Sequence, residues 1–343
     1  MQSVQPSPRR RWVRAIAPRR VMPRVLSHIL PAAVLLAIVA IGGALTARHL
    51  FTMPGPLPTA RDVVVPHGGA MRIAQTLQEA NVIASPLAFR LAMLATAGEG
   101  PLHAAELAFP AHAPLREVLT TLRTAHPVEH RLTIPEGLTA RQITALLDHV
   151  DALTGAVALP DEGAVLPDTY SYEYGTTRAA LVARAQVVAG KALAAAWADR
   201  DPGVPLASPR DALILASIVE RETAKPDERA HIAAVFLNRL RRGMRLQADS
   251  TVVYAASGGL GMLNHPLTRG ELEQDSPYNT YRSHDLPPEP ICAPGMASLR
   301  AVLHPAPSDD LYFVADGTGG HVFAATLAQH EANVKRWRSL EVR

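Results

Sequence analysis

The chain has a single cysteine, Cys292, and few aromatic residues. One cysteine excludes an intramolecular disulfide and any zinc site built from several cysteines. Phe, Trp and Tyr make up 5% of the residues, and alanine supplies much of the 48% hydrophobic fraction. We therefore expect a core built largely from helices that present Leu, Ile and Val among small residues. With 343 residues, the chain can hold two modest folded units plus extensions.

Acidic residues are absent from the first 48 positions, where eight arginines occur. Without these eight, 26 basic residues face 31 acidic ones, a formal balance of −5. The high overall pI therefore comes from the N-terminal segment, and the rest of the chain does not have the charge of a nucleic-acid-binding protein. We expect no nucleic-acid partner and assign the arginines to lipid headgroups.

An uncharged run of 23 residues, 25–47, separates Arg24 from Arg48. As a helix it would span roughly 34 Å, which is enough to cross a bilayer. Seven arginines precede it, so the positive-inside rule predicts a cytoplasmic segment 1–24 and an exported remainder. The alternative is a cleaved signal peptide with its small-residue site at Gly42 to Ala44, but the run is longer than a usual signal-peptide core. We expect a single-pass anchor in the inner (cytoplasmic) membrane.

A linker is predicted at 48–60, where three prolines and a glycine cluster. Two later stretches, 63–77 and 132–146, then resemble each other, with proline, glycine and arginine recurring at an offset of 69. Each predicts a strand, a Pro-x-Gly turn and a short amphipathic helix, because the hydrophobic period changes across the turn. Coincidence between two ordinary strand-turn-helix units is the alternative.

Three further segments have readable patterns. Residues 85–125 indicate helices with loops, and residues 177–199 predict a long alanine-rich helix. Residues 161–174 have little helical character and carry tyrosines at the alternate positions 170, 172 and 174. That alternation predicts an extended segment with one aromatic face.

A well-marked helix start stands at Ser208, with proline at the first helical position and Asp211 three residues after the cap. All positions from 212 to 219 except Ser217 are apolar, so this helix must be largely buried. Glu220 follows directly, with Ser217 on its face. Partial burial there favours the protonated carboxyl that a general acid needs. The alternative is a solvated helix end, in which Glu220 pairs with Arg221 or Lys225.

The next helix is predicted to begin at an Asp227 cap and to stop at Gly243. Polar side chains suited to sugar hydroxyls follow at 244–251 and again at 276–281, in irregular structure typical of binding grooves. The candidate substrate-binding residues are Ser217, Gln247, Asp249, Asn279 and Tyr281. For each residue taken singly, ordinary turn chemistry is an equal alternative.

Several of these strings together resemble the endolytic murein transglycosylase family, also called YceG-like or MltG. The resemblance runs from the apolar N-terminal segment to Trp337. It is carried by Leu215 to Thr223, Val235 to Leu240, Met244 to Gln247 with Asp249, Tyr278 to Tyr281, Leu311 to Ala315 and Gly319 to Phe323.

The resemblance implies an α+β fold, with a LysM-like βα module at 61–155 and a mixed α+β catalytic domain at 156–343 in the periplasm. It also implies that Glu220 is the catalytic acid/base of a lytic transglycosylase, which leaves a 1,6-anhydro end on the glycan strand. One carboxylate suffices when the nucleophile is the sugar's own hydroxyl, whereas ordinary glycosidases use two. Asp249 could stabilise the oxocarbenium-like transition state. The implied partners are glycan strands, the bilayer and, as candidates, wall synthases.

Some positions depart from the family pattern. Ala164 and Val165 replace aromatic residues, Glu289 replaces a common glycine, and Ala104 to Leu107 match poorly. Fewer rings mean less stacking area for sugars. No His-Glu-x-x-His, Gly-x-Ser-x-Gly or phosphate-loop motif occurs, so we expect neither a metal nor another cofactor. The two rivals are a glycan-binding scaffold without catalysis and a hydrolytic muramidase.

Overall fold

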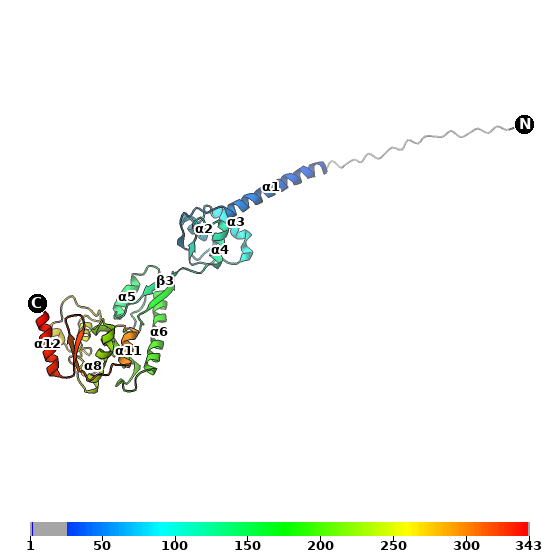
Figure 1. The fold of residues 1–343 in the computed structure, drawn as a ribbon. Coiled ribbons are helices and arrows are strands. Elements are labelled where there is room, and N and C mark those ends of the chain that lie inside the picture. Colours follow the sequence, from blue (N-terminus) through cyan, green and yellow to red (C-terminus); the bar gives the residue numbers. More distant parts are fainter. Residues whose placement is uncertain (1, 3–25, 342–343) are drawn as a thin grey trace. The chain divides into compact units, whose positions relative to one another are not determined.

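The computed structural model describes residue 2 and residues 26–341. It divides into two compact units, the first containing 26–104 and 108–125, the second 105–107 and 126–341 (Figure 1). Both contain helices together with two-stranded sheets, so the predicted α+β class is confirmed. The predicted cytoplasmic segment 1–24 lies outside the described residues, apart from Gln2. The predicted domain boundary at 155 falls inside the second unit, and the domain scheme stays a prediction.

The first unit begins with the apolar helix α1 (Leu26–Thr52). Residues Pro31–Thr52 are long and apolar enough to cross a membrane, and none of that stretch is buried within the protein. This agrees with the predicted anchor. The helix continues to Thr52, so the first residues of the predicted linker are helical.

The first strand-turn-helix unit consists of β1 (Arg61–Val64) and α2 (Ala70–Glu79), as predicted. It is followed by α3 (Pro86–Ala95), the 3-10 turn η1 (Ala97–Glu99), β2 (Glu106–Phe109) and α4 (Leu115–Thr124). β2 pairs with β1, so the prediction of helices with loops for 85–125 missed a strand there. The alternation that buries Leu107 and Phe109 is typical of a half-buried strand.

The second strand-turn-helix pattern lies near the start of the second compact unit. It consists of β3 (Glu129–Thr133) and α5 (Ala140–Asp148). β3 pairs antiparallel with β4 (Thr169–Glu173), with Leu132 opposite Tyr170. Tyr170 and Tyr172 face the core, as the alternation predicted, whereas Tyr174 lies beyond the strand and is exposed. Against this sheet packs α6 (Arg178–Ala198), which has the predicted extent. α6 also meets the length and composition criteria for a membrane span, although its inner face is buried in the protein.

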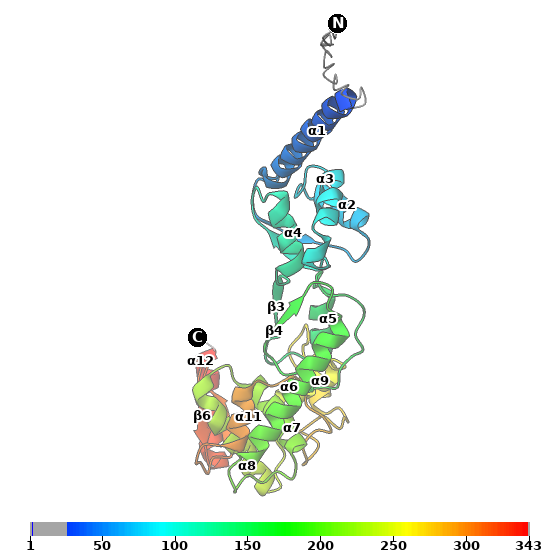
Figure 2. The same ribbon diagram turned by 90° about the vertical axis from the view of Figure 1, so that its right-hand side faces the viewer.

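The largest core lies among α7 (Pro209–Glu222), α8 (Arg229–Arg241) and α11 (Met296–Leu303) (Figure 2). Ser208 and Asp211 form the predicted capping box of α7, and every residue from 212 to 219 except Leu213 is buried. The predicted Asp227 cap of α8 was wrong. Asp227 lies in the 3-10 turn η2 (Pro226–Glu228), and α8 begins after it without a side-chain cap.

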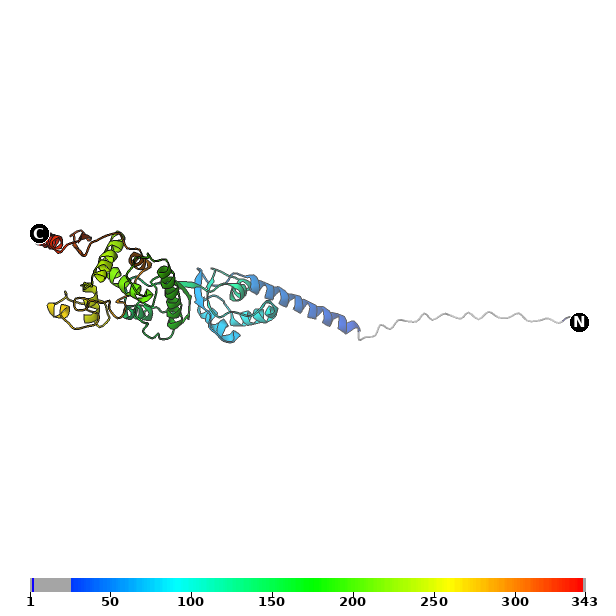
Figure 3. The ribbon, with the colours of Figure 1, turned by 90° about the horizontal axis from the view of Figure 1, so that it is seen from below.

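The remaining elements surround this core. α9 (Asp249–Ala256) and α10 (Arg269–Leu272) lead into a long irregular stretch before α11. β5 (Tyr312–Ala315) and β6 (His321–Ala324) form an antiparallel hairpin. The terminal helix α12 (Leu327–Glu341) packs beside that hairpin (Figure 3). The sheets are small, so the helices supply most of the core around the candidate site.

Candidate active site

Glu220 lies in the last turn of α7, where the buried helix meets the surface. Its side chain is 6% exposed, so the predicted burial of this carboxylate is confirmed. The Gly295 backbone N–H donates a hydrogen bond to Oε2 at 3.0 Å, and the Arg229 guanidinium lies 3.7 Å from Oε1. A buried carboxylate with one backbone donor and one cation beside it is held in a single orientation.

A second carboxylate, Glu136, approaches the same nitrogen of Arg229 as Glu220 does. The guanidinium Nη2 lies 3.9 Å from Glu136 Oε2, and the Glu136 side chain is 45% exposed. Burial and the neighbouring Glu220 carboxylate raise the pKa of Glu136, and Arg229 lowers it in part. The buried Nε of Arg229 has no hydrogen-bond partner among the described residues. Two carboxylates therefore share one arginine in a partly desolvated site.

Two glycines allow this close approach. A Cβ at Gly295 would overlap the Glu136 carboxyl, so any larger residue here would force Glu136 away from the backbone that binds Glu220. Gly137 has a φ of 78°, in the left-handed region that favours glycine, and its position faces the Glu220 side chain. Its N–H donates to the Ala293 carbonyl at 2.9 Å. The Pro-x-Gly turn is therefore tied directly to the segment that carries Gly295.

Arg221 connects the same turn to a more distant loop. Its guanidinium donates to the Gly261 carbonyl at 2.8 Å and to the Gly137 carbonyl at 3.4 Å. Arg221 thus does not pair with Glu220, and the solvated-end alternative for Glu220 is not what the structure contains. The residue after the candidate acid instead helps to fix the loop that carries Glu136.

Two predicted substrate-binding residues are buried. Ser217 is 0% exposed, and its hydroxyl donates to the Ile214 carbonyl while accepting from the Ile291 N–H. Asn279 is 1% exposed and holds a turn together through the Leu272 and Gln274 carbonyls. Neither side chain reaches the surface, so any part they have in substrate binding is a positioning one.

The other three predicted residues lie close to one another. Tyr281 donates a hydrogen bond to Asp249 at 2.5 Å. The backbone N–H of Gln247, whose φ is 51°, donates to the carbonyl of Thr280, the residue before Tyr281, at 3.1 Å. Burial raises the pKa of Tyr281, and its hydrogen bond to Asp249 raises it further. This group adjoins Glu222 rather than Glu220, because Ser250 donates to the Glu222 carboxyl at 2.7 Å.

Glu222 thus sits in a second acidic environment on the same helix. Burial raises its pKa, and the nearby Asp249 contributes, while the bond from Ser250 partly offsets both. Glu222 lies two positions from the candidate acid, on a different side of α7, and faces Asp249.

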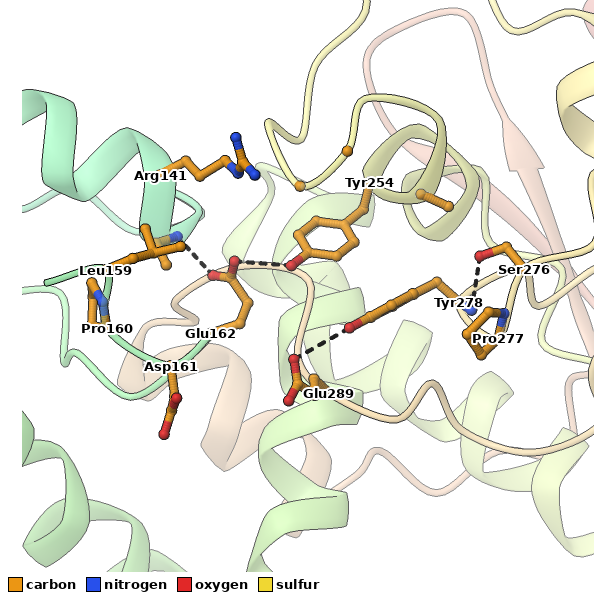
Figure 4. A pocket seen from close by; sticks show the side chains of 14 residues that line it. Arg141, Leu159, Pro160, Asp161, Glu162, Tyr254, Ser276, Pro277, Tyr278 and Glu289 are labelled. Atoms are coloured by element: carbon orange, nitrogen blue, oxygen red, sulfur yellow. Dashed lines mark hydrogen bonds between the residues drawn. The ribbon is translucent and has the colours of Figure 1, made fainter.

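A pocket of about 550 Å³ lies between the start of α5 and the end of α9 (Figure 4). Two tyrosine rings, Tyr254 and Tyr278, line it with centroids 5.0 Å apart. Each ring is held by a carboxylate, because Tyr254 donates to Glu162 at 3.1 Å and Tyr278 donates to Glu289 at 3.2 Å. Burial raises the pKa of Glu162, although bonds from the Ala140 N–H and Tyr254 lower it again.

The pocket is joined to Glu220 by one short loop. The Ala140 N–H, at the start of α5, donates to Glu162 at 2.9 Å in the pocket wall. Gly137, three residues earlier, faces Glu220. Three residues span at most about 11 Å, so the pocket wall and the candidate acid lie within a few sugar rings of each other.

His321 has a structural partner. Its ring bonds Glu228 at 2.7 Å, and its backbone N–H donates to the same carboxylate at 3.0 Å. Across residues 26–341 no cluster of three or more His, Cys, Asp or Glu side chains could hold a metal ion.

Sequence patterns did not identify Glu136 or Arg229 as candidate site residues. Glu136 is the middle residue of the second Pro-x-Gly turn, and Arg229 lies two residues after the predicted cap Asp227. A comparison of the two Pro-x-Gly turns could have drawn attention to Glu136, because the turn at 66–68 has a histidine at the same position. Nothing local could have placed that carboxylate beside α7.

Curated relatives share part of this sequence. An endolytic murein transglycosylase of Bacillus subtilis (strain 168) is 43% identical over 127 residues, covering 37% of this chain and 34% of that protein. An endolytic murein transglycosylase of Streptococcus pneumoniae serotype 2 (strain D39 / NCTC 7466) is 35% identical over 178 residues, covering 50% of this chain and 31% of that protein. The chain thus spans about a third of the length of the curated relatives it matches.

A solved structure is also similar. A crystal structure of a yceG-like protein from Listeria monocytogenes covers 80% of this chain and 98% of its own, with 28% identity and a TM-score of 0.49. The family model described as YceG-like family matches residues 63–336, well over half of the chain. Its match includes the second half of β1, the Glu136 turn, Glu220 and both strands of the β5–β6 hairpin. The chain belongs to the YceG-like family.

Proposed function

We propose that the chain is an endolytic murein transglycosylase that cuts peptidoglycan glycan strands, with Glu220 as its general acid and base. The observation that carries the proposal is the Glu220 carboxylate, 6% exposed at the end of a buried helix and held by Gly295 and Arg229. The names of the two curated relatives support the substrate class.

In the proposed reaction, protonated Glu220 donates its proton to the oxygen between N-acetylmuramic acid and N-acetylglucosamine, and that C–O bond breaks. Arg229 stabilises the carboxylate that remains. Glu220 then removes the proton from the muramic acid's own C6 hydroxyl, whose oxygen bonds to C1. The products are a 1,6-anhydro end and a new free end, and no water is consumed.

The Tyr254 and Tyr278 pocket suits a neighbouring sugar of the same strand. Ring faces stack on the C–H face of a sugar, and the carboxylates of Glu162 and Glu289 can accept bonds from its hydroxyls. Gln247, Asp249 and Tyr281 form a second polar group that we assign to substrate binding, with Asp249 as a candidate for stabilising positive charge. In a cleavage assay, Tyr278→Ala and Asp249→Asn should each raise KM or lower kcat, and unchanged kinetics would remove that residue from the site.

We also propose a membrane topology, a domain organisation and partners for the chain. The α1 helix would anchor the chain in the inner membrane with residues 1–24 in the cytoplasm and 156–343 in the periplasm. Residues 61–155 would form a LysM-like module on the glycan, and wall synthases would be partners. Protease protection of each end in sealed inverted vesicles tests the orientation, and an accessible catalytic domain in those vesicles would reverse it.

The decisive experiment compares wild type, Glu220→Gln and Glu79→Gln in the digestion of purified glycan strands, with products read by mass spectrometry. Glu79 ends α2 and is exposed, so its variant controls for the same chemical change at another helix end. Loss of general acid/base catalysis should lower the rate about 10²- to 10⁴-fold in Glu220→Gln only. Anhydro ends released at the wild-type rate by Glu220→Gln would falsify the assignment.

A hydrolytic muramidase is the second candidate, and Glu136 is the observation that favours it. Two carboxylates beside one arginine could act as acid and base on an external water. The masses decide between the two reactions, because a hydrolytic end is heavier by one water than an anhydro end. If wild type gave only the heavier ends, the transglycosylase mechanism would be replaced by hydrolysis.

A further inference from the structure

Helix α3 exposes three leucines on one face. Leu87 is 63% exposed, Leu91 60% and Leu94 64%, and their spacing of four and three residues places them in one stripe. Phe89 is the one residue of this helix that is fully buried. A ten-residue helix with its leucines turned outward leaves an apolar surface that a soluble protein would ordinarily cover.

The leucine stripe lies beside the end of the apolar helix α1. Leu91 and Ala95 line an apolar cavity of about 480 Å³ together with Ala47, Leu50 and Phe51 of α1. Figures 1 and 2 both place α3 next to the lower end of α1. Ala47 is the last residue of the uncharged run, so this is the level at which a membrane-crossing α1 would leave the hydrocarbon.

Positive charge flanks the apolar surface. Arg48, Arg90 and Arg116 are all exposed, and they adjoin residues that line the cavity or the stripe. Glu117 is the acidic residue beside Arg116. Arginines around an apolar helix face match the arrangement of phosphate headgroups above acyl chains.

We propose that the leucine stripe of α3 inserts into the outer edge of the bilayer that α1 crosses, so that the first unit rests on the membrane through a second apolar contact. Lipid is the occupant because the stripe is continuous with the surface of α1 at its exit from the membrane. The proposal requires α1 to span the bilayer, and it is independent of the catalytic role of Glu220.

The test uses the full chain in proteoliposomes, with one nitroxide label per sample. Cys292 is the single cysteine and is fully buried, so Cys292→Ala gives a clean background. Labels are placed at Leu91→Cys and Leu94→Cys, with Gln78→Cys on exposed α2 as the aqueous control and Leu36→Cys on α1 as the membrane control. Accessibility to oxygen, which partitions into lipid, is compared with accessibility to a water-soluble nickel complex.

Labels at 91 and 94 should be severalfold more accessible to oxygen than to nickel, as at 36, whereas the label at 78 should show the reverse. Nickel accessibility at 91 and 94 equal to that at 78 would overturn the proposal. Low accessibility to both probes with dipolar broadening would place a second copy of the chain on the stripe and would also overturn it. A water-accessible label at 36 would show instead that α1 does not span the bilayer.

Discussion

The two strand-turn-helix units share one local pattern but differ in their surroundings. β1 with α2 and β3 with α5 both fold as a strand, a Pro-x-Gly turn and a short helix. In the turn between β1 and α2 the central residue is His67, which lines a shallow pocket with Pro101 and His103. In the turn between β3 and α5 it is Glu136, which faces Arg229 beside Glu220.

The difference arises from tertiary contacts. The second turn accepts a hydrogen bond from Arg221 of α7, and its Gly137 N–H donates to the Ala293 carbonyl. The first turn belongs to the first compact unit, whereas α7 belongs to the second. The helix α5 also has a complete capping box at Thr139 and Gln142, while α2 begins at Gly69 without a side-chain cap. A repeated sequence pattern thus determines local shape, and packing determines which copy can take part in chemistry.

After the loss of Glu220 itself, the largest expected effect comes from Gly295, the residue that lies against the second turn. In Gly295→Ala the new Cβ overlaps the Glu136 carboxyl, so either Glu136 or the N–H that binds Glu220 must move. A displacement of about 1 Å in a catalytic group can cost on the order of 10² in rate. We expect kcat to fall by about that factor, measured by release of soluble fragments from glycan strands.

The control for this variant is a measurement of thermal unfolding, which separates loss of activity from loss of folded protein. Gly295 is buried before the start of α11, so thermal unfolding of Gly295→Ala is measured first and the rates are compared on folded protein only. Full activity in a well-folded Gly295→Ala protein would show that the Glu136 turn and the Glu220 carboxylate do not need this close approach.

A smaller effect is expected at the turn residue itself. Glu136→Gln removes the charge that shares Arg229 with Glu220, and we expect about a tenfold loss in kcat/KM, equivalent to roughly 1.4 kcal/mol. His67→Gln makes the matched change in the first unit and should leave the rate as it is. Equal losses in both variants would mean that the two turns serve the enzyme in the same way.

The pH dependence of stability gives a second readout for Glu136. Burial and Glu220 raise its pKa above the ordinary value of 4.5. A carboxyl whose pKa is raised in the folded state supports folding below the unfolded pKa and loses that support as pH rises through the folded value. Glu136→Gln should therefore gain stability relative to wild type as the pH rises above 4.5, by thermal unfolding, and only modestly, because the side chain is 45% exposed. A difference that stays constant as the pH rises would contradict the assignment.

Much of the local structure followed from the sequence. The cap at Ser208, the apolar run after it and the alternating tyrosines each depend on neighbours within a few residues, and these predictions were confirmed for α7, Tyr170 and Tyr172. β2 was missed because a four-residue strand among helices has too short a pattern to show its period. The Asp227 cap was wrong because a 3-10 turn delays the start of α8.

The candidate site was only partly predictable for the same physical reason. Burial of Glu220 follows from its position after an apolar helix, which is local information. Its partners Gly295 and Arg229 come from other segments, as does Glu136, and long-range packing brings them together. The burial of Ser217 and Asn279 likewise depends on backbone groups that sequence patterns do not locate.

The smallest expected effects distinguish the two turns through their glycines. Gly68 has a φ of 148° and Gly137 one of 78°, so alanine at either position adopts a backbone conformation that it disfavours. Each variant should lose about 1–2 kcal/mol of stability. In protein that remains folded, however, Gly68→Ala should keep its specific activity, whereas Gly137→Ala should lose part of it because strain in that turn moves Glu136 relative to Arg229. Thermal unfolding and active-fraction-corrected rates, measured on both variants, separate the two quantities. If both variants kept full specific activity, the second turn would be a structural copy of the first, and Glu136 would have no part in the reaction.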